Sequence, residues 1–504
     1  MKNKKFTLPY SYYNTISYLG TFIAGISFIV IIFLVLFSEI FGLGSSYSGI
    51  ITYIVMPVFL IVGLIMIPLG MIINRKKSKE PNFDPARKWP KFDLNDKATW
   101  NAFMIFTPVT IVLLIFTGIG SYKAFHITES VEFCGKLCHK VMEPEYTAFQ
   151  HSSHARIACV KCHVGSGANW YVRSKISGLY QVYAVLTGVY PQPIKTPIKN
   201  LRPARETCEE CHWPQKFYPQ SLVVEKHFLA DETNTEWDIY LQMKTGSLHK
   251  GQGLNEGIHW HINPNVEIQY KSSEDREHIF WVKYTDKKTG KSYVYTDNRE
   301  QKTKNKSSQT RVMDCMDCHN RPSHDYKSPM KFINELMAAG KISTELPDIK
   351  IVAMEILNTE FPTKDSAMSY IKNHVIEYYS LMYEDIFKEK KKLIDQAIAG
   401  IQEGYSHNIF PFMKVKWEAY PNHIGHLEFN GCFRCHDNRH KSPEGRTISM
   451  DCNLCHKIVA QGTPDQIQTS DIMQELEFIH PNDEKQGWKK KLCYDCHKKL
   501  YKNE

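Results

Sequence analysis

The chain has 504 residues, of which 43% are hydrophobic and 23% charged, and it contains 14 cysteines and 22 histidines. This composition excludes disorder as the main state, and the length is enough for two or three domains. The formal net charge is +9, but residues 1–125 hold 12 Lys/Arg against 5 Asp/Glu, and the remainder holds 50 against 48. The charge pattern therefore does not indicate a basic domain that binds nucleic acid.

Three uninterrupted apolar runs, at residues 15–37, 50–73 and 102–120, predict transmembrane helices. Each is close to the length of about 20 residues that a helix needs to cross a bilayer. Lysines and arginines precede the first run and fill the second connection, whereas the first connection, residues 38–49, has none. By the positive-inside rule the N-terminus is expected in the cytoplasm, and everything after about residue 121 outside. No small-residue cleavage site follows the first run, so we expect an uncleaved anchor.

All 14 cysteines fall into seven pairs, and each pair is followed at once by a histidine. Two thiols can add to the vinyl groups of one haem, and the adjacent histidine can then bind its iron. Zinc would require two pairs to converge, and disulfides would not require the histidines. The sequence therefore predicts seven covalently attached c-type haems. Their motifs are Cys134/Cys138/His139, Cys159/Cys162/His163, Cys208/Cys211/His212, Cys315/Cys318/His319, Cys432/Cys435/His436, Cys452/Cys455/His456 and Cys493/Cys496/His497.

The predicted fold is mainly α-helical and irregular: three N-terminal transmembrane helices precede an extracytoplasmic multihaem domain with a small β insertion. Alternation at 266–270, followed by runs at 279–284 and 292–295, predicts a β meander within an insertion at about 235–305. Apolar positions 371, 375, 378, 382 and 386 predict one long or two shorter helices in 366–403. Little of the outer part looks like a conventional hydrophobic core, so we expect haems to replace one.

The motif spacing predicts four regions. These are a membrane domain at 1–125, a four-haem module with the β insertion at 126–330, a helical spacer at 331–420 and a three-haem module at 421–504. The membrane spans contain no histidine. A haem held between two of these helices by histidine pairs is therefore excluded, and the haems of this chain cannot carry electrons across the bilayer.

Residues 134–188 contain a series of characteristic short motifs. They are Met142-x-Pro144-x-Tyr146, Ser152-x-His154, Cys159-x-x-Cys162-His163-Val164, Lys175 and Gly188. By these residues the segment resembles the NapC/NirT/NrfH family of membrane-anchored, quinol-oxidising cytochromes. The similarity continues through Arg202–His212 and, after the insertion, at Cys315–His319 and His324. Three spans with seven motifs look most like the ImcH-type inner-membrane cytochromes of metal-respiring bacteria.

The resemblance implies that haem 1 lies at the membrane surface beside a quinol site. Met142 would lie on or near its iron and Lys175 close to the quinol oxygen. Many relatives have an acidic residue where this chain has Gln181, whose amide can hydrogen-bond a quinol but cannot accept its proton. The first motif has one extra residue between its cysteines and another before Met142. Met142 and His139 therefore remain alternative iron ligands.

Seven proximal histidines leave 15 others for at most seven remaining axial positions. The resemblance favours His154, His227 and His324 as distal ligands. Placement near the later motifs adds His426, His440 and His480, with His407 and His423 as further candidates. Four more histidines lie in the insertion, where the Gly257–His261 segment is a possible haem cap. They are His249, His259, His261 and His278.

Together these features predict a cytochrome that oxidises quinol, most simply menaquinol, at the outer face of the bacterial cytoplasmic membrane during anaerobic respiration. Its electrons would pass to a periplasmic multihaem cytochrome or reductase. One alternative is a terminal reductase of a small oxyanion, which needs an iron with an open position. The other is an electron-wire subunit of a larger respiratory complex. The C-x-x-C-K variant typical of nitrite reductases of this chemistry is absent.

Overall fold

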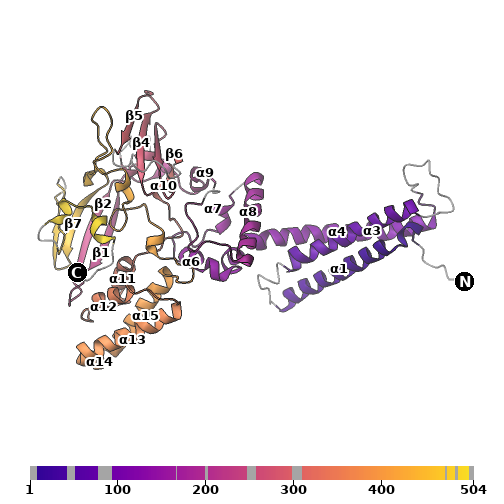
Figure 1. Cartoon of the computed structure of the whole chain (residues 1–504), viewed down its shortest axis with the longest axis horizontal. Coiled ribbons are helices and arrows are strands. Elements are labelled where there is room, and N and C mark those ends of the chain that lie inside the picture. Colours follow the sequence, from indigo (N-terminus) through magenta and orange to yellow (C-terminus); the bar gives the residue numbers. More distant parts are fainter. Residues whose placement is uncertain are drawn as a thin grey trace. The chain divides into compact units, whose positions relative to one another are not determined.

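The computed structural model describes residues 8–41, 51–77, 93–165, 167–198, 202–246, 257–297, 309–471, 474–482 and 486–498. Most of the two predicted membrane connections, parts of the insertion and His249 lie outside the described residues. The chain forms two units (Figure 1). Unit 1 comprises Met1–His139 with Ala158–Val160, and unit 2 comprises Lys140–Ile157 with Lys161–Glu504.

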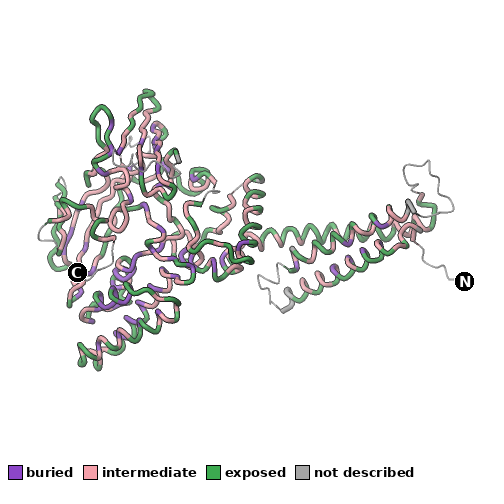
Figure 2. Tube along the Cα trace, in the orientation of Figure 1, coloured by how far each residue is buried: buried purple, intermediate pink, exposed green. Residues whose placement is uncertain are grey.

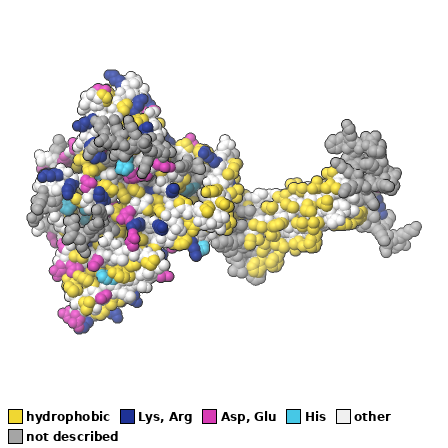
Figure 3. Space-filling view, viewed as in Figure 1, with side chains coloured by type: hydrophobic (Ala, Val, Ile, Leu, Met, Phe, Trp, Pro, Cys, Tyr) yellow, Lys and Arg dark blue, Asp and Glu magenta, His cyan; other side chains and the backbone are white. Residues whose placement is uncertain are grey.

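Unit 1 contains the three apolar helices that the sequence predicts. Their candidate membrane spans are Thr15–Phe37, Ile51–Asn74 and Lys97–Glu129. Hydrophobic side chains cover the outside of these helices (Figure 3), as a lipid environment requires. The elements are α1 (Thr15–Phe41), a π-helical turn η2 (Ile51–Val55), α3 (Met56–Lys77), α4 (Lys97–Glu129) and α5 (Val131–Lys136).

Small residues bring α1 and α3 close together. A Cβ added to Gly20 would lie 2.7 Å from the carbonyl oxygen of Gly63, so neither position accommodates a larger side chain without movement. One turn away, the buried Ser17 hydroxyl donates a hydrogen bond to the carbonyl oxygen of Ile67 at 3.0 Å. Close backbone approach and interhelical hydrogen bonds are the interactions that hold helices together where lipid removes the hydrophobic driving force.

Each cysteine motif from the second onward begins on a short helical element, and the elements of the second, fourth and seventh motifs contain both cysteines. The helices of the first part are α6 (His139–Gln150), α7 (Cys159–His163), α8 (Ala168–Thr187), α9 (Ala204–Cys208) and α10 (Cys315–Cys318). Cys432 and Cys452 lie on the 3-10 turns η8 (Gly431–Arg434) and η9 (Cys452–Leu454), and the seventh motif lies on α16 (Cys493–His497). In a helical turn the two thiols of a C-x-x-C pair share one face, as attachment to one haem requires.

One sheet of unit 2 is the predicted meander. Its strand order is β5-β4-β3-β6, all antiparallel. The side chains of β3 alternate strictly between buried and half-buried positions, with Val266, Ile268 and Tyr270 inward, which explains why the alternation was readable in the sequence. The strands are β3 (Val266–Ser272), β4 (Ile279–Asp286), β5 (Ser292–Thr296) and β6 (Gln309–Val312).

A second antiparallel sheet was not predicted. It comprises β1 (Ser221–Phe228), β2 (Glu236–Met243), β7 (His456–Thr463) and β8 (Gln466–Thr469), in the order β1-β2-β7-β8. Strand β7 begins at the histidine of the sixth motif and pairs with β2 from the region before the fourth motif. This sheet therefore joins two parts of the chain that motif spacing assigned to separate modules.

Unit 2 also contains a conventional hydrophobic core, contrary to our expectation for the outer part. It is formed by α11 (Pro329–Ala338), α12 (Ile349–Leu357), α13 (Lys364–Met382), α14 (Glu384–Glu389) and α15 (Lys391–Asn408). Buried residues are dense in these helices (Figure 2). Three helices occupy the segment where one or two were predicted. The helices break at Tyr383 and Lys390. On α13 the inward face follows Ile371, Val375 and Tyr379, so Met382, assigned to the apolar stripe, is 66% exposed.

Candidate haem sites

The cysteines are arranged as separate pairs and not as a metal-binding cluster. None of the 14 forms a disulfide. Within the described residues, no group of three or more His, Cys, Asp or Glu side chains could hold a metal ion. The zinc and disulfide alternatives therefore find no support in the geometry of the described residues, whereas thioether attachment requires cysteines that are not in disulfides.

The protein covers these attachment cysteines to different extents. The exposed ones are Cys162, Cys211, Cys452 and Cys496. Cys211 departs furthest from the helical pattern, because α9 ends at Cys208 and residues 210–213 are all exposed. The Cys211 N–H still donates to the Cys208 carbonyl oxygen at 3.1 Å, so one hydrogen-bonded turn joins the two cysteines. Attachment at Cys211 thus stays a prediction, for a site at the surface of unit 2.

The spacing of facing imidazoles can be compared with the spacing that iron ligation requires. Two imidazoles bound to one iron from opposite sides each place a nitrogen about 2 Å from the metal, so their ring centres lie about 6 Å apart. Four proximal histidines face a histidine that the sequence proposed as distal ligand, at centroid distances between 6.0 and 6.1 Å. These pairs are His163–His324, His212–His154, His456–His426 and His497–His480.

The two other proximal histidines of unit 2 face residues of the insertion. The rings of His319 and His259 lie 6.4 Å apart, and those of His436 and His261 lie 5.9 Å apart. The sequence marked His259 and His261 only as a possible haem cap. The local signal was the pair of histidines in Gly257-Ile258-His259-Trp260-His261, but nothing in that segment indicates which motifs they face.

Hydrogen bonds orient several of these rings for metal binding. In each case Nδ1 contacts a backbone carbonyl oxygen, so Nε2 is left to the metal. The carbonyl fixes both the tautomer and the ring orientation. The contacts are His154 to Pro322 at 3.0 Å, His324 to Glu145 at 3.1 Å, His261 to Ile258 at 2.7 Å and His436 to Ser449 at 2.8 Å.

Two other candidate histidines have both ring nitrogens engaged by the protein. Nδ1 of His440 contacts the Asp437 carboxylate and its Nε2 contacts the Ile279 carbonyl oxygen, each at 3.1 Å. His423 is held between the Asp317 carbonyl oxygen at 3.0 Å and the Glu277 carboxylate at 2.9 Å. Neither ring has a nitrogen left for iron, so the structure does not bring His440 into the position that its proximity to the fifth motif suggested.

His227 also faces no proximal histidine at ligation spacing. It lies on β1, with Nδ1 3.4 Å from the side-chain amide of Asn334. Burial lowers its pKa to about 4, and the nearby Lys350 and His497 contribute to the shift. His227 thus lies close to the seventh motif without facing a proximal ring, and its role as a ligand stays a prediction.

The first motif has no second histidine opposite it among the described residues. His139 begins α6, and Met142 follows three residues later on the same helix. Residues three apart share one face of a helix, so these two cannot approach one iron from opposite sides. The geometry is compatible with either as a ligand but not with both across one haem.

Helix α8 carries Lys175 and Gln181 of the quinol site that the resemblance implied, whereas Met142 lies on α6. Its exposed apolar side chains recur at helical spacing, namely Val172, Ile176, Leu179, Tyr183 and Leu186. Lys175 is half-buried at the border of this stripe, with Nζ 5.0 Å from the centre of the Tyr171 ring. At about 100° per residue, Gln181 lies on the side opposite the stripe, about 120° from Lys175. The helix therefore does not bring Lys175 and Gln181 onto one face.

The first four motifs contact one another in chain order. The Cys134 thiol donates a hydrogen bond to Cys159 and lowers its pKa to about 7. Between the third and fourth motifs, the Cys208 thiol donates a hydrogen bond to Cys315, which raises the pKa of Cys208, and Cys162 of the second motif adds to that rise. Cysteines of consecutive motifs therefore lie side by side.

The series continues through the last motifs. Burial raises the pKa of Cys318 to about 12, and Cys432 of the next motif contributes. Burial likewise raises the pKa of Cys455 to about 11, again with Cys432 contributing. Finally, burial raises the pKa of Cys493, and Cys452 of the preceding motif adds to the shift. Every motif therefore neighbours the next one along the chain.

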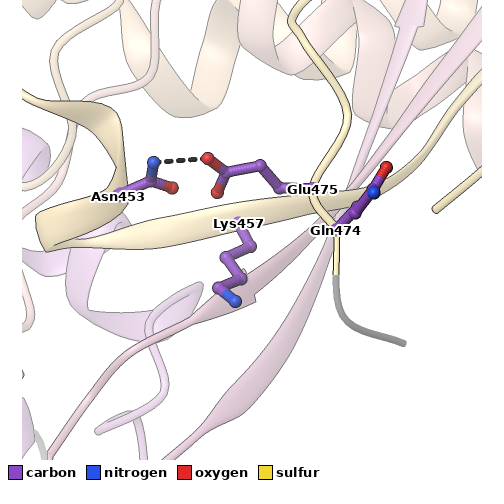
Figure 4. Close-up of a pocket in the computed structure, with 4 residues that line it drawn as sticks. All are labelled: Asn453, Lys457, Gln474 and Glu475. Carbon is purple, nitrogen blue, oxygen red and sulfur yellow. Dashed lines mark hydrogen bonds between the residues drawn. The ribbon is translucent and has the colours of Figure 1, made fainter. Parts of the chain in front are cut away.

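A surface pocket of about 540 Å³ lies against the sixth motif (Figure 4). It is lined by Asn453, Lys457, Gln474 and Glu475, and the amide of Asn453 donates a hydrogen bond to the Glu475 carboxylate. Its walls are polar, unlike the mainly apolar pockets that hold a quinone-sized ring. This pocket is therefore not a second candidate for a quinol site.

Comparisons with known proteins agree with this geometry. Residues 96–196 match the model of the NapC/NirT cytochrome c family, N-terminal region. The cytochrome c-type protein ImcH of Geobacter sulfurreducens is 40% identical over 489 residues, which cover 96% of this chain and 95% of ImcH. The cytochrome c-type protein NrfH of Wolinella succinogenes is 37% identical over 78 residues, covering 15% of this chain and 44% of NrfH. No solved structure matches. The chain therefore belongs to the NapC/NirT family of membrane c-type cytochromes, in a full-length arrangement that it shares with ImcH.

Proposed function

We propose that this protein is a membrane-anchored, seven-haem cytochrome that oxidises quinol at the outer face of the cytoplasmic membrane and delivers the electrons to a periplasmic acceptor. The observation that carries the proposal is the unbroken series of neighbouring motifs from Cys134 to Cys496. Each covalently bound haem would supply an iron that takes up and releases one electron. The chain's contribution is to hold seven such sites in a fixed order.

The histidine pairs favour electron relay over reduction of a small oxyanion. Six facing pairs at 5.9–6.4 Å would leave six irons with two imidazole ligands each. A terminal reductase needs an iron with an open position and hydrogen-bond donors beside it. The first motif is then the one for which the described histidines supply no second axial ligand. It directly follows the membrane helices.

The amphipathic helix α8 supports a site at the membrane surface. Leu179 and Leu186 expose 71% and 81% of their area to solvent in a continuous apolar stripe. Such a stripe on a helix with lysine and arginine at its border is typical of helices that lie in the headgroup region of a bilayer. A quinol, which is itself membrane-dissolved, would reach Lys175 from this side.

Lys175 is the residue to which we assign binding of the quinol oxygen. A charged ammonium group can donate a hydrogen bond to that oxygen but cannot accept a proton from it. Oxidation of one quinol yields two electrons and two protons, so another acceptor, such as water at the outer surface, must take the protons. Gln181 cannot serve as this acceptor, and its place on the opposite side of α8 separates it from Lys175.

The proposed topology places the N-terminus in the cytoplasm and unit 2 outside. Because the apolar runs 15–37, 50–73 and 102–120 carry no histidine, quinol oxidation and electron exit occur on the same side of the membrane. Such a reaction contributes no charge separation. The acceptor, a periplasmic multihaem cytochrome or reductase, would dock near the last motif of the series.

The experiment is quinol reduction of the full-length protein in liposomes. Haem absorbance is followed by stopped flow after addition of a menaquinol analogue, with and without a quinol-site inhibitor. Fast, inhibitor-sensitive reduction of several haems supports the proposal. If quinol reduces none of the haems while dithionite reduces all of them, the quinol site belongs to another protein and the proposal is wrong.

A further inference from the structure

We propose that a single turn of the insertion, η5 (Ile258–Ile262), supplies the sixth iron ligand of two neighbouring haems. His259 would bind the iron of the fourth motif opposite His319, and His261 would bind the iron of the fifth motif opposite His436. This inference rests on the haem count of the proposed function and is independent of quinol oxidation.

The first argument is geometric. His259 and His319 face each other at 6.4 Å with rings 16° from parallel, whereas His261 and His436 face each other at 5.9 Å with rings at 81°. In a 3-10 helix each residue advances by about 120°, so side chains two positions apart leave the turn in different directions. One short turn can therefore serve two irons.

The second argument is that the turn is fixed at both ends. The backbone N–H groups of Ile258 and His259 donate to the carbonyl oxygens of Lys244 and Thr245 at 2.8 and 2.9 Å. At the other end, the Arg205 guanidinium donates to the Ile262 carbonyl oxygen at 3.1 Å. Ligands held by such outer contacts keep their orientation when the metal changes its charge.

The residue before the turn, Gly257, is required for this placement. A Cβ at Gly257 would lie 2.5 Å from the Lys244 carbonyl oxygen and 2.5 Å from the backbone nitrogen of Gly246. Both obstacles are backbone atoms, which cannot move aside as a flexible side chain could. The close approach that lets the turn hydrogen-bond to 244–245 is therefore possible only with glycine.

The third argument concerns the two haem sites themselves. Cys318 and Cys432 of the fourth and fifth motifs are neighbours. His261 has Nδ1 on the Ile258 carbonyl oxygen, and His436 has Nδ1 on the Ser449 carbonyl oxygen, so Nε2 of each ring is left to a metal. The competing histidines near these motifs, His423 and His440, have both nitrogens engaged.

The consequence is a mechanical link between the family-like four-haem region and the last three motifs. The two haem sites at this junction would be held by one rigid segment, so their separation and orientation could not drift independently. The insertion, which the family resemblance does not cover, then has a defined role at this junction.

The test is the ligation state of the full-length protein in detergent. We expect His259→Ala and His261→Ala each to open one iron, seen as conversion of one low-spin to one high-spin signal in electron paramagnetic resonance. Each reduced variant should bind one additional carbon monoxide per chain relative to wild type, and the double variant two. His440→Ala is the matched control and should bind no additional carbon monoxide.

Haem content and chemical rescue make the result decisive. Total haem, measured as pyridine haemochrome, should equal wild type in every variant, and added imidazole should restore the low-spin spectrum of His259→Ala and His261→Ala. His259→Met and His261→Met retain a ligand and cover the case in which the alanine variants do not accumulate. They should stay low-spin with an altered spectrum.

Either of two results would overturn the assignment: unchanged spectra and carbon monoxide binding in His259→Ala and His261→Ala with full haem content, or an equal gain in the His440→Ala control. A wild-type haem content below seven would instead contradict the haem count of the proposed function. The two failures are therefore distinguishable.

Discussion

His440 and Asp437 form a buried pair in which Nδ1 of the imidazole lies 3.1 Å from the carboxylate, while Nε2 contacts the Ile279 carbonyl oxygen. Although burial raises the pKa of Asp437, hydrogen bonds from His440 and from backbone N–H groups bring it below the usual range. We expect His440→Ala to lower the free energy of unfolding by about 1–3 kcal/mol, because it leaves buried partners unpaired. Denaturant unfolding with the haem spectrum recorded in parallel measures this. Loss of a low-spin haem signal would show that His440 is a ligand after all.

The Lys175 prediction concerns the quinol reaction. Lys175→Ala should slow reduction by a menaquinol analogue at least about tenfold while reduction by dithionite stays unchanged, because one charged hydrogen bond to the quinol oxygen is lost. Gln181→Ala is the matched variant on the opposite side of α8, and we expect it to change the rate by less than about twofold. Stopped flow in liposomes measures both. Equal quinol rates in Lys175→Ala and wild type would remove Lys175 from the site.

The exposed stripe of α8 should matter only with a membrane present. Leu179→Glu and Leu186→Glu place charges where the helix is expected to enter the headgroup region, which disfavours its insertion. We expect slower reduction by membrane-dissolved quinol in liposomes. Leu454→Glu, at a 46% exposed leucine of the sixth motif, is the control. If all three variants are reduced at the wild-type rate, α8 does not contact the bilayer.

Lys350 gives a pH prediction. It is 1% exposed on α12, where its side-chain nitrogen donates hydrogen bonds to the Asn334 side chain and the Met330 carbonyl oxygen, and burial lowers its pKa to about 7. Between about pH 7 and pH 10 the unfolded chain holds a proton that the folded chain lacks, so this lysine makes stability rise with pH. Lys350→Met should remove that rise. Thermal unfolding at about pH 7.5 and pH 9.5, both within this range, measures it.

The control for Lys350 is Lys331→Met, at an exposed lysine on the neighbouring helix α11. We expect Lys331→Met to follow the wild-type dependence on pH. An unchanged difference between the two pH values in Lys350→Met would mean that Lys350 keeps its proton in the folded chain.

The order of the motifs predicts where electrons leave. Replacing Cys493 and Cys496 by serine should remove the last haem, leave quinol reduction of the others intact, and slow delivery to a soluble multihaem cytochrome. Replacing Cys452 and Cys455 instead should isolate the last haem, so that quinol reduces it slowly or not at all. Stopped flow with the acceptor added separates these cases. Normal delivery without the last haem would place the exit at an earlier motif.

The sequence predicted the features that depend on local pattern. The three membrane helices follow from apolar runs, the attachment motifs from their spacing, and the β meander from the alternation at Val266–Tyr270. Of the six distal histidines proposed from sequence, the structure places His154, His324, His426 and His480 opposite a proximal ring. These four are either part of the family pattern or precede a late motif.

The features that the sequence could not predict depend on contacts between distant segments. His440 is close to the fifth motif in the chain, but the ring opposite His436 comes from residue 261. Strands β1 and β7 have short, weakly patterned sequences, and their sheet becomes evident only when the two segments are brought together.

The pairing of β2 with β7 also bears on how the protein is made. Tyr240 pairs with Ala460 and Asp238 with Gly462, so β2 has an unpaired edge until the sixth motif has been synthesised. An open strand edge is prone to associate with other chains, and pairing across so long a loop is slow. Haem attachment to the intervening motifs would take place while this edge of β2 is still unpaired. The edge of β2 must therefore be protected while assembly proceeds from the first motif to the last. A shortage of haem late in synthesis would leave an aggregation-prone intermediate.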